Sequence, residues 1–134
     1  MSRSTAKRAL GVALTTLAFF GATSLARADI NDYEFQLIQK EIKKGDAILS
    51  VRLVHKADGK VVPDAVIFAT RLDMAPDSMA EMQTTIALAP SAEPGVYRFK
   101  ADLSMAGGWR LSLGAKIQGE TGTLKNELVL KALP

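Results

Sequence analysis

The chain has 134 residues, of which 48% are hydrophobic and 23% are charged, and its formal net charge is +3. A chain of this length forms one domain. It contains no cysteine, which excludes disulfide bonds, thiolate metal sites, iron–sulfur clusters and cysteine nucleophiles. Aromatic residues make up only 6% of the sequence, which argues against the stacking platforms that bind single-stranded nucleic acid.

Residues 1–28 have the pattern of a secretory signal peptide. Basic residues precede an apolar run from Ala9 to Ala22, and Ala26-Arg27-Ala28 closes the segment with the small-x-small spacing of a cleavage site. The apolar run is shorter than the ~20 residues that a membrane-spanning helix needs. We therefore predict cleavage after Ala28, a periplasmic protein with no retained membrane anchor, and a single domain over residues 29–134.

The predicted cleavage changes the charge of the protein. Residues 1–28 contain four basic residues and no acidic one, so their removal from the 17 basic and 14 acidic residues of the chain leaves a net charge of −1. The basic balance therefore belongs to the signal peptide, and no argument for a nucleic-acid partner or an anionic membrane survives its removal.

The remaining sequence reads as short strands separated by turn residues such as glycine, proline and aspartate. The predicted strands, in chain order, are Tyr33 to Ile42, Ile48 to Val54, Ala65 to Thr70, Thr84 to Leu88, Val96 to Lys100, Trp109 to Gln118 and Leu124 to Leu130. Between the third and fourth of these, the segment Met79 to Gln83 is compatible with one helical turn and no more. The pattern predicts an all-β fold, an immunoglobulin-like antiparallel β-sandwich of six to seven strands.

The clearest strand begins at Trp109. Apolar and polar or small residues alternate over ten positions, which is the pattern of a strand with one buried face and one solvated face. Trp109, Leu111, Leu113 and Ile117 are therefore predicted to face the core. Tyr97, which follows Pro94-Gly95-Val96, is similar to the tyrosine that ties a corner in immunoglobulin-like folds.

No catalytic constellation is visible in the predicted domain. Its one histidine, His55, falls at the end of a predicted strand beside a turn, and the carboxylates are scattered. A nucleophile would need a base beside it, and acid–base chemistry would need positioned groups of suitable pKa. We predict that the protein is not an enzyme and has no catalytic residues.

Methionine is the residue type in the predicted domain that indicates a binding site for a metal ion. Four methionines lie in the predicted domain, and they are Met74, Met79, Met82 and Met105. The thioether is a soft ligand that selects Cu(I), and by the same argument Ag(I), and it needs no thiolate. If these residues form a metal site, Trp109 could shield the ion through a cation–π contact.

Two other interpretations of the methionines stay open. Methionine fills gaps in cores, so the four side chains could simply close one end of the sandwich. Alternatively, they could form an adaptable apolar surface for a partner protein. Trp109 is likewise compatible with a plain core position.

Four segments of the sequence together resemble the FixH/YtkA-like family of exported β-sandwich domains. They are Val62-Pro63-Asp64-Ala65-Val66-Ile67, then Asp73-Met74-Ala75-Pro76 with Met79, then Pro94-Gly95-Val96-Tyr97, and Asp102-Leu103-Ser104-Met105-Ala106-Gly107-Gly108-Trp109. The resemblance extends over roughly Tyr33 to Leu130. FixH proteins keep a membrane helix, whereas this chain is predicted to lose its only apolar run, so it is closer to the soluble YtkA-like branch.

The resemblance implies a non-catalytic domain that accompanies heavy-metal efflux adaptors or copper-handling proteins of the cell envelope. The leading hypothesis from the sequence is thus a periplasmic accessory domain that binds or passes Cu(I) or Ag(I). Its ligands would be Met74, Met79, Met82 and Met105, with Trp109 as the shield. The alternative is a metal-free interaction module that docks on an envelope transporter or adaptor through its methionine-rich rim.

Overall fold

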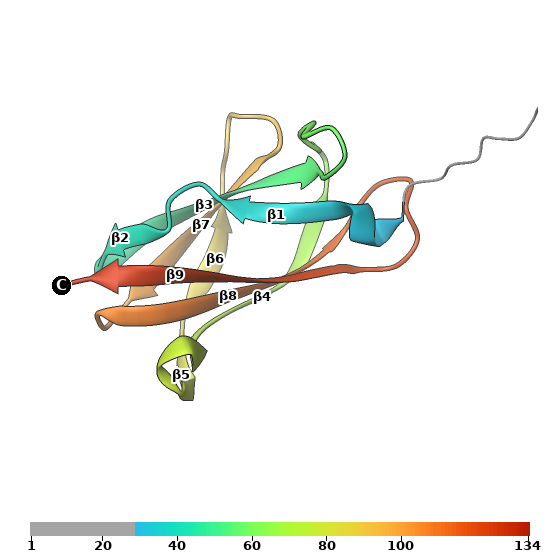
Figure 1. Cartoon of the computed structure of the whole chain (residues 1–134). Coiled ribbons are helices and arrows are strands. Elements are labelled where there is room, and N and C mark those ends of the chain that lie inside the picture. Colours follow the sequence, from blue (N-terminus) through green and yellow to red (C-terminus); the bar gives the residue numbers. More distant parts are fainter. Residues whose placement is uncertain (1–28) are drawn as a thin grey trace, which may run out of the picture.

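The computed structural model describes residues 29–134, which contain nine β-strands and two short 3-10 helices (Figure 1). In chain order they are η1 (Ile30–Asp32), β1 (Tyr33–Leu37), β2 (Glu41–Lys43), β3 (Gly45–His55), β4 (Val66–Met74), η2 (Ala75–Asp77), β5 (Met79–Thr84), β6 (Ile86–Ala89), β7 (Val96–Leu103), β8 (Gly107–Lys116) and β9 (Leu124–Leu133). The predicted signal peptide lies outside the described residues. Neither helix of residues 29–134 is long and apolar enough to cross a membrane.

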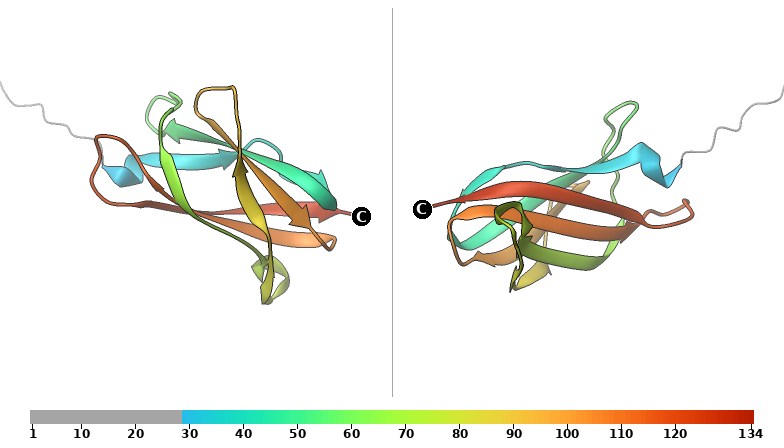
Figure 2. Two further views of the ribbon diagram at one scale, coloured as in Figure 1. Left: turned by 180° about the vertical axis from the view of Figure 1, so that it is seen from behind. Right: turned by 60° about the horizontal axis from the view of Figure 1, so that its bottom comes forward.

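The strands form two sheets that pack face to face. One sheet has the order β1-β3-β7-β6 and the other has the order β2-β9-β8-β4-β5. The turned views show these two layers and the η2–β5 unit that projects from one edge (Figure 2). The predicted all-β sandwich is confirmed. Among the described strands, all pairs are antiparallel except the short parallel pair of β2 and β9.

The structure has more strands than the six to seven predicted, because two stretches of chain pass from one sheet to the other. The first predicted strand is divided into β1, which pairs with β3, and β2, which pairs with β9. In the same way β5 and β6 are separated only by Thr85 but belong to different sheets. The prediction of a helical turn at Met79 to Gln83 is wrong, since this segment is β5. The turn lies just before it, at η2, where Pro76 has the fixed φ that suits the start of a helix.

The core is formed by the inward faces of both sheets. Trp109, Leu111, Leu113 and Ile117 are all buried, as their alternation predicts, and so is Leu130, which pairs with Trp109. Ala115 is buried on the same side, and the alternate residues Arg110, Ser112, Gly114 and Lys116 lie on the outer face of the five-stranded sheet. The period of two therefore identified the buried face of this strand correctly.

Tyr97 ties a loop, as its position suggested. Its hydroxyl donates a hydrogen bond to the carbonyl oxygen of Val62 at 2.8 Å and accepts one from the N–H of Ala65 at 3.0 Å. The loop between β3 and β4 is thereby fixed to the start of β7. His55 lies at the end of β3, partly exposed, with its Nδ1 3.3 Å from the Asp58 carboxylate.

Candidate functional site

One end of the sandwich contains all of the predicted site residues. Two chain segments reach it: the hairpin from Met74 to Met82, which includes η2, and the turn from Met105 to Trp109, which joins β7 to β8. We call this region the methionine end. The two segments meet directly, because the N–H of Gly108 donates a hydrogen bond to the Asp77 carboxylate at 3.1 Å. A metal or docking site that used methionines from both segments would require this contact.

Met74 lies in the core. It is the last residue of β4, its exposed fraction is 0%, and it is paired with Met79 across the β4–β5 ladder. A methyl group added at Gly107 would lie 3.0 Å from its Cε. Met74 therefore fills the space beneath the β7–β8 turn, and its sulfur is out of reach of solvent.

The other methionines lie progressively nearer the surface. Met79 is partly buried and packs against the core. Met82 is 37% exposed and Met105 is 41% exposed. The four side chains thus range from fully buried to exposed, and the thioethers that solvent can reach most readily are those of Met82 and Met105.

Trp109 is also fully buried. Its indole N–H donates a hydrogen bond to the carbonyl oxygen of Met105 at 3.0 Å. This bond satisfies the one polar atom of a buried indole and fixes the backbone of the turn that carries the Met105 side chain. Trp109 therefore positions the turn from within the core.

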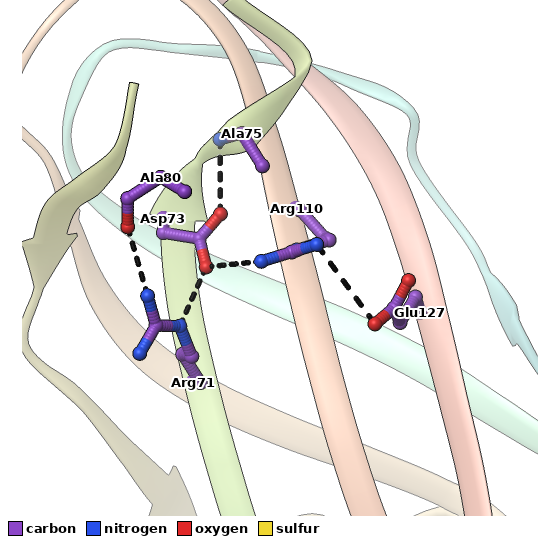
Figure 3. Close-up of polar contacts among 6 residues, drawn as sticks. All are labelled: Arg71, Asp73, Ala75, Ala80, Arg110 and Glu127. Atoms are coloured by element: carbon purple, nitrogen blue, oxygen red, sulfur yellow. Dashed lines mark hydrogen bonds and ion pairs between the residues drawn. The ribbon is translucent and has the colours of Figure 1, made fainter. Parts of the chain in front are cut away.

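A buried carboxylate organises the methionine end, and the sequence analysis missed it. Asp73 is 0% exposed although it lies on the outer face of the five-stranded sheet. One of its oxygens accepts hydrogen bonds from Arg71 at 2.6 Å and from Arg110 at 2.9 Å, and the other accepts the N–H of Ala75 at 2.9 Å (Figure 3). Arg71 also donates to the carbonyl oxygen of Ala80. One carboxylate thus connects β4, β8, η2 and β5.

The electrostatics of Asp73 follow from these contacts. Burial raises its pKa, but the hydrogen bonds from Arg110, Arg71 and the Ala75 N–H outweigh burial and hold the pKa at about 2. Asp73 is therefore ionised at neutral pH and neutralised by two guanidinium groups. The sequence did hold a signal for this arrangement, since residues two apart on a strand share a face and Arg71 and Asp73 are such a pair.

Gly107 and Gly108 allow η2 to lie against the start of β8. A Cβ at Gly108 would lie 2.9 Å from Cβ of Pro76, and a Cβ at Gly107 would overlap the Asp77 carboxylate. Gly107 also has φ +134°, a backbone conformation that favours glycine. Pro76, Gly107 and Gly108, which belong to two of the four segments that carry the family resemblance, thus form this close contact.

The arrangement offers thioethers but no conventional metal cage. Within residues 29–134, no three or more histidine, aspartate or glutamate side chains gather where they could hold a metal ion. Two carboxylates of the methionine end are engaged, since Asp73 binds two arginines and Asp77 binds the backbone of β8. A metal held here would depend on methionine sulfur, which selects soft ions.

Comparison with known proteins gives the family. The model of the YtkA-like family matches residues 27–114, which is more than half of the chain. The chain belongs to the YtkA-like family. No curated protein sequence matches it with significance.

Comparison with solved structures finds two that are weakly similar to this chain. The filamin domain of Lin-41 has a TM-score of 0.44 and 14% identity, and the match covers 76% of this chain and 92% of that one. The C-terminal domain of ZirS has a TM-score of 0.45 and 9% identity, and the match covers 89% of this chain and 86% of that one. Both identities are far below a level at which a site or a function could be transferred.

Proposed function

We propose that this YtkA-like chain is an exported accessory domain that acts by binding, and that its methionine end docks on a partner protein of the cell envelope, such as a transporter or an efflux adaptor. The observation that supports this most is the exposure of Met82 and Met105 on a frame whose other members, Met74, Asp73 and Trp109, are completely buried. Flexible methionine side chains on a rigid base suit a surface that adapts to a partner.

Site-specific photo-crosslinking in the native envelope tests this docking. A photoreactive phenylalanine analogue is placed at Met82 or at Met105, and the adducts are identified by mass spectrometry. Leu88 on β6 is the matched control, because it is 57% exposed and belongs to the other sheet. We expect one envelope transporter or adaptor to be captured at both methionine positions and not at Leu88. An identical set of adducts at all three positions would contradict the proposal.

Soft-metal binding is the second candidate function of the same end. It is favoured by the meeting of the two methionine segments, because the Gly108–Asp77 hydrogen bond brings the turn of Met105 against the hairpin of Met82. Cu(I) or Ag(I) would be held by Met79, Met82 and Met105. Met74 could join them only if the β7–β8 turn opened, since its sulfur is buried.

Titration with Cu(I) against a competing chelator separates the two candidates. The comparison is between the natural protein, the Met82→Leu, Met105→Leu double variant and the Met74→Leu variant. A metal site predicts that the affinity for Cu(I) falls at least about tenfold in the double variant, because leucine keeps the volume and removes the sulfur. Equal affinity in all three proteins excludes the metal site and leaves the docking proposal standing.

Periplasmic location is part of the same proposal. It depends on the basic start, the short apolar run and the Ala26-Arg27-Ala28 motif of the sequence. N-terminal sequencing of the protein from a periplasmic extract is expected to begin at Asp29. An intact N-terminus in the membrane fraction would show instead that the apolar run is retained as an anchor.

A further inference from the structure

The outer face of the five-stranded sheet differs in charge from the rest of the domain. On β4, β8 and β9 this face carries five basic and two acidic side chains, whose orientation follows from the ladder register and the alternating burial. The basic ones are Arg71, Arg110, Lys116, Lys125 and Lys131. Residues 29–134 hold 13 basic and 14 acidic residues, so those outside these seven side chains number eight and twelve. They include Glu41 and Lys43, which the edge strand β2 places on the same face beside β9. We call this surface the basic face.

Of the two acidic residues of the basic face, Asp73 is buried between its arginines, whereas Glu127 is exposed and makes one long ion pair. Asp73 binds Arg71 and Arg110, and Glu127 lies 3.9 Å from Arg110. In the part of the chain that the structure describes, none of the three lysines of the face has a carboxylate within 4.0 Å. The excess positive charge is therefore available to a partner.

A largely apolar hollow of about 230 Å³ lies in the basic face, and its charged lining residues are Arg71, Lys125 and Glu127. Its wall is Phe68, which is 56% exposed. Phe68 is the extra residue where the β4–β8 register shifts between Ile67 and Ala69, and such a bulge turns a side chain away from its regular direction. Its floor includes Ala69 and Gly114.

Gly114 is needed to keep this hollow open. A Cβ at Gly114 would lie 3.2 Å from Cβ of Ala69 and 3.5 Å from Cζ of Phe68. An added Cβ would therefore press against Ala69 and occupy part of the floor, in van der Waals contact with the ring of Phe68. A glycine within a strand often marks a close approach by another chain or a ligand, and here its environment is an exposed aromatic ring beside a lysine.

We propose that the basic face binds an acidic, extended segment of a partner protein, which inserts one apolar side chain into the hollow between Phe68 and Gly114. The volume is below the roughly 300–1,000 Å³ typical of small-molecule pockets, so it suits a single anchor side chain. The unpaired lysines complement acidic residues on either side of the anchor. The concave shape distinguishes this from adsorption to a lipid surface. The basic face shares Arg71 and Arg110 with the methionine end, but the hollow at Phe68 and Gly114 contains no methionine, so variants of Phe68 and of Met82 or Met105 test the two proposals independently.

Defined peptides test this binding. The probe is a fluorescently labelled 12-residue peptide of alternating glutamate and leucine. One comparison peptide has lysine in place of glutamate, and another has serine in place of leucine. Dissociation constants come from fluorescence anisotropy, and the binding face comes from amide chemical shifts of the isotopically labelled protein expressed from the full-length chain. We expect only the first peptide to bind, with shift changes at Phe68, Gly114 and Lys125.

Matched variants distinguish binding at this site from non-specific binding of the peptide. Phe68→Ala removes the wall of the hollow and is expected to weaken binding about fivefold or more. Leu88→Ala is its control, since Leu88 has the same exposure on the other sheet. The Lys116→Glu, Lys125→Glu pair is expected to weaken binding about tenfold, with Lys100→Glu on β7 as its control, and the loss should shrink at high salt.

Several results would overturn the proposal. One is equal binding of the lysine peptide, and another is an unchanged affinity in both the Phe68 and the lysine variants. Binding to vesicles of phosphatidylcholine and phosphatidylglycerol without binding to the peptide would assign the face to a membrane. Concentration-dependent self-association that is lost in Phe68→Ala would assign it to a second copy of the chain.

Discussion

At the methionine end, η2 is held against β8 by a buried carboxylate with two arginines, whereas at the opposite end the β3–β4 loop is held by the hydroxyl of Tyr97. The interactions at the methionine end are between ionised groups, of which Asp73 is completely buried. The interactions at the opposite end are hydrogen bonds of one neutral hydroxyl group. A buried charge is costly when its partners are removed, and a hydroxyl costs less to lose. The methionine end should therefore tolerate change less well than the tyrosine end, and it is also the end that carries the exposed methionines.

The largest effect is expected for Asp73→Asn. This change keeps the size of the side chain but removes the buried carboxylate that Arg71 and Arg110 share, so the free energy of unfolding should fall by about 3 kcal/mol. Equilibrium unfolding in urea at neutral pH measures it. Glu127→Gln is the control, because Glu127 also neighbours Arg110 but is exposed, and its cost should stay below about 0.5 kcal/mol. Equal effects of the two changes would show that the buried pair is not what holds this end.

The same residue predicts a dependence on pH. Because the folded pKa of Asp73 is about 2 and its ordinary value is 3.8, the ionised carboxylate stabilises the folded state above pH 4, and this contribution is lost as the pH falls through 2. The difference in stability between the natural protein and Asp73→Asn should therefore be constant from neutral pH to about pH 4 and shrink below it. Urea unfolding at a series of acidic pH values measures this difference. A constant difference down to pH 2 would contradict the assigned pKa.

Gly107→Ala tests the contact between η2 and β8. The new Cβ would meet the Asp77 carboxylate in a backbone conformation of φ +134°, so the cost should be about 2–3 kcal/mol. Gly119→Ala is the matched control: its φ is +88° and nothing lies within 4 Å of the added Cβ. That variant should cost only about 1 kcal/mol, for backbone strain alone. Thermal unfolding of both variants measures the difference, and equal costs would mean that the close approach of Asp77 is unimportant.

The sequence predicted the local features of both ends better than their long-range contacts, for a physical reason. The alternation from Trp109 to Ile117 and the position of Tyr97 are local patterns, and local patterns are enough to assign a strand face or a corner. Between β5 and β6 the chain crosses from one sheet to the other. This crossing depends on the strands with which β5 and β6 pair, and no local pattern contains that information. The burial of Met74 depends likewise on the turn of Gly107, which is distant in sequence.

The candidate site was predicted in part. The two methionine segments do meet, and Trp109 does belong to the same end of the fold. The sequence did not predict the network around Asp73. Its three hydrogen-bond donors, Arg110, Arg71 and the Ala75 N–H, belong to two strands and a 3-10 helix that only the fold brings together. The proline and glycines of the segments that carry the resemblance form a packing contact in the structure, and the ligand role of the methionines stays a prediction.

Tyr97→Phe should have a moderate effect at the opposite end. The change removes the bond to the Val62 carbonyl and leaves the Ala65 N–H without its acceptor, while the ring keeps its packing. The expected cost is about 1–1.5 kcal/mol, in the range of a lost neutral hydrogen bond. Urea unfolding measures it, and hydrogen exchange of the Ala65 amide should accelerate locally. A cost as large as that of Asp73→Asn would remove the distinction between the two ends.

The smallest effect on stability is expected at Met105, although its importance for function should be the greatest. The side chain is 41% exposed, so Met105→Leu should change the free energy of unfolding by less than about 0.5 kcal/mol. Met74→Leu keeps volume in a closed core and should cost more, up to about 1.5 kcal/mol.

The order of the two variants should reverse for binding of the photo-crosslinking partner or of Cu(I): Met105→Leu should weaken binding, and Met74→Leu should not. Thermal unfolding and binding measured on the same two variants therefore separate a docking or metal-binding methionine from a packing one. If Met74→Leu weakened binding as much as Met105→Leu did, the exposed position of Met105 would lose its special role, and the rigid base of this end would be the feature that the partner requires.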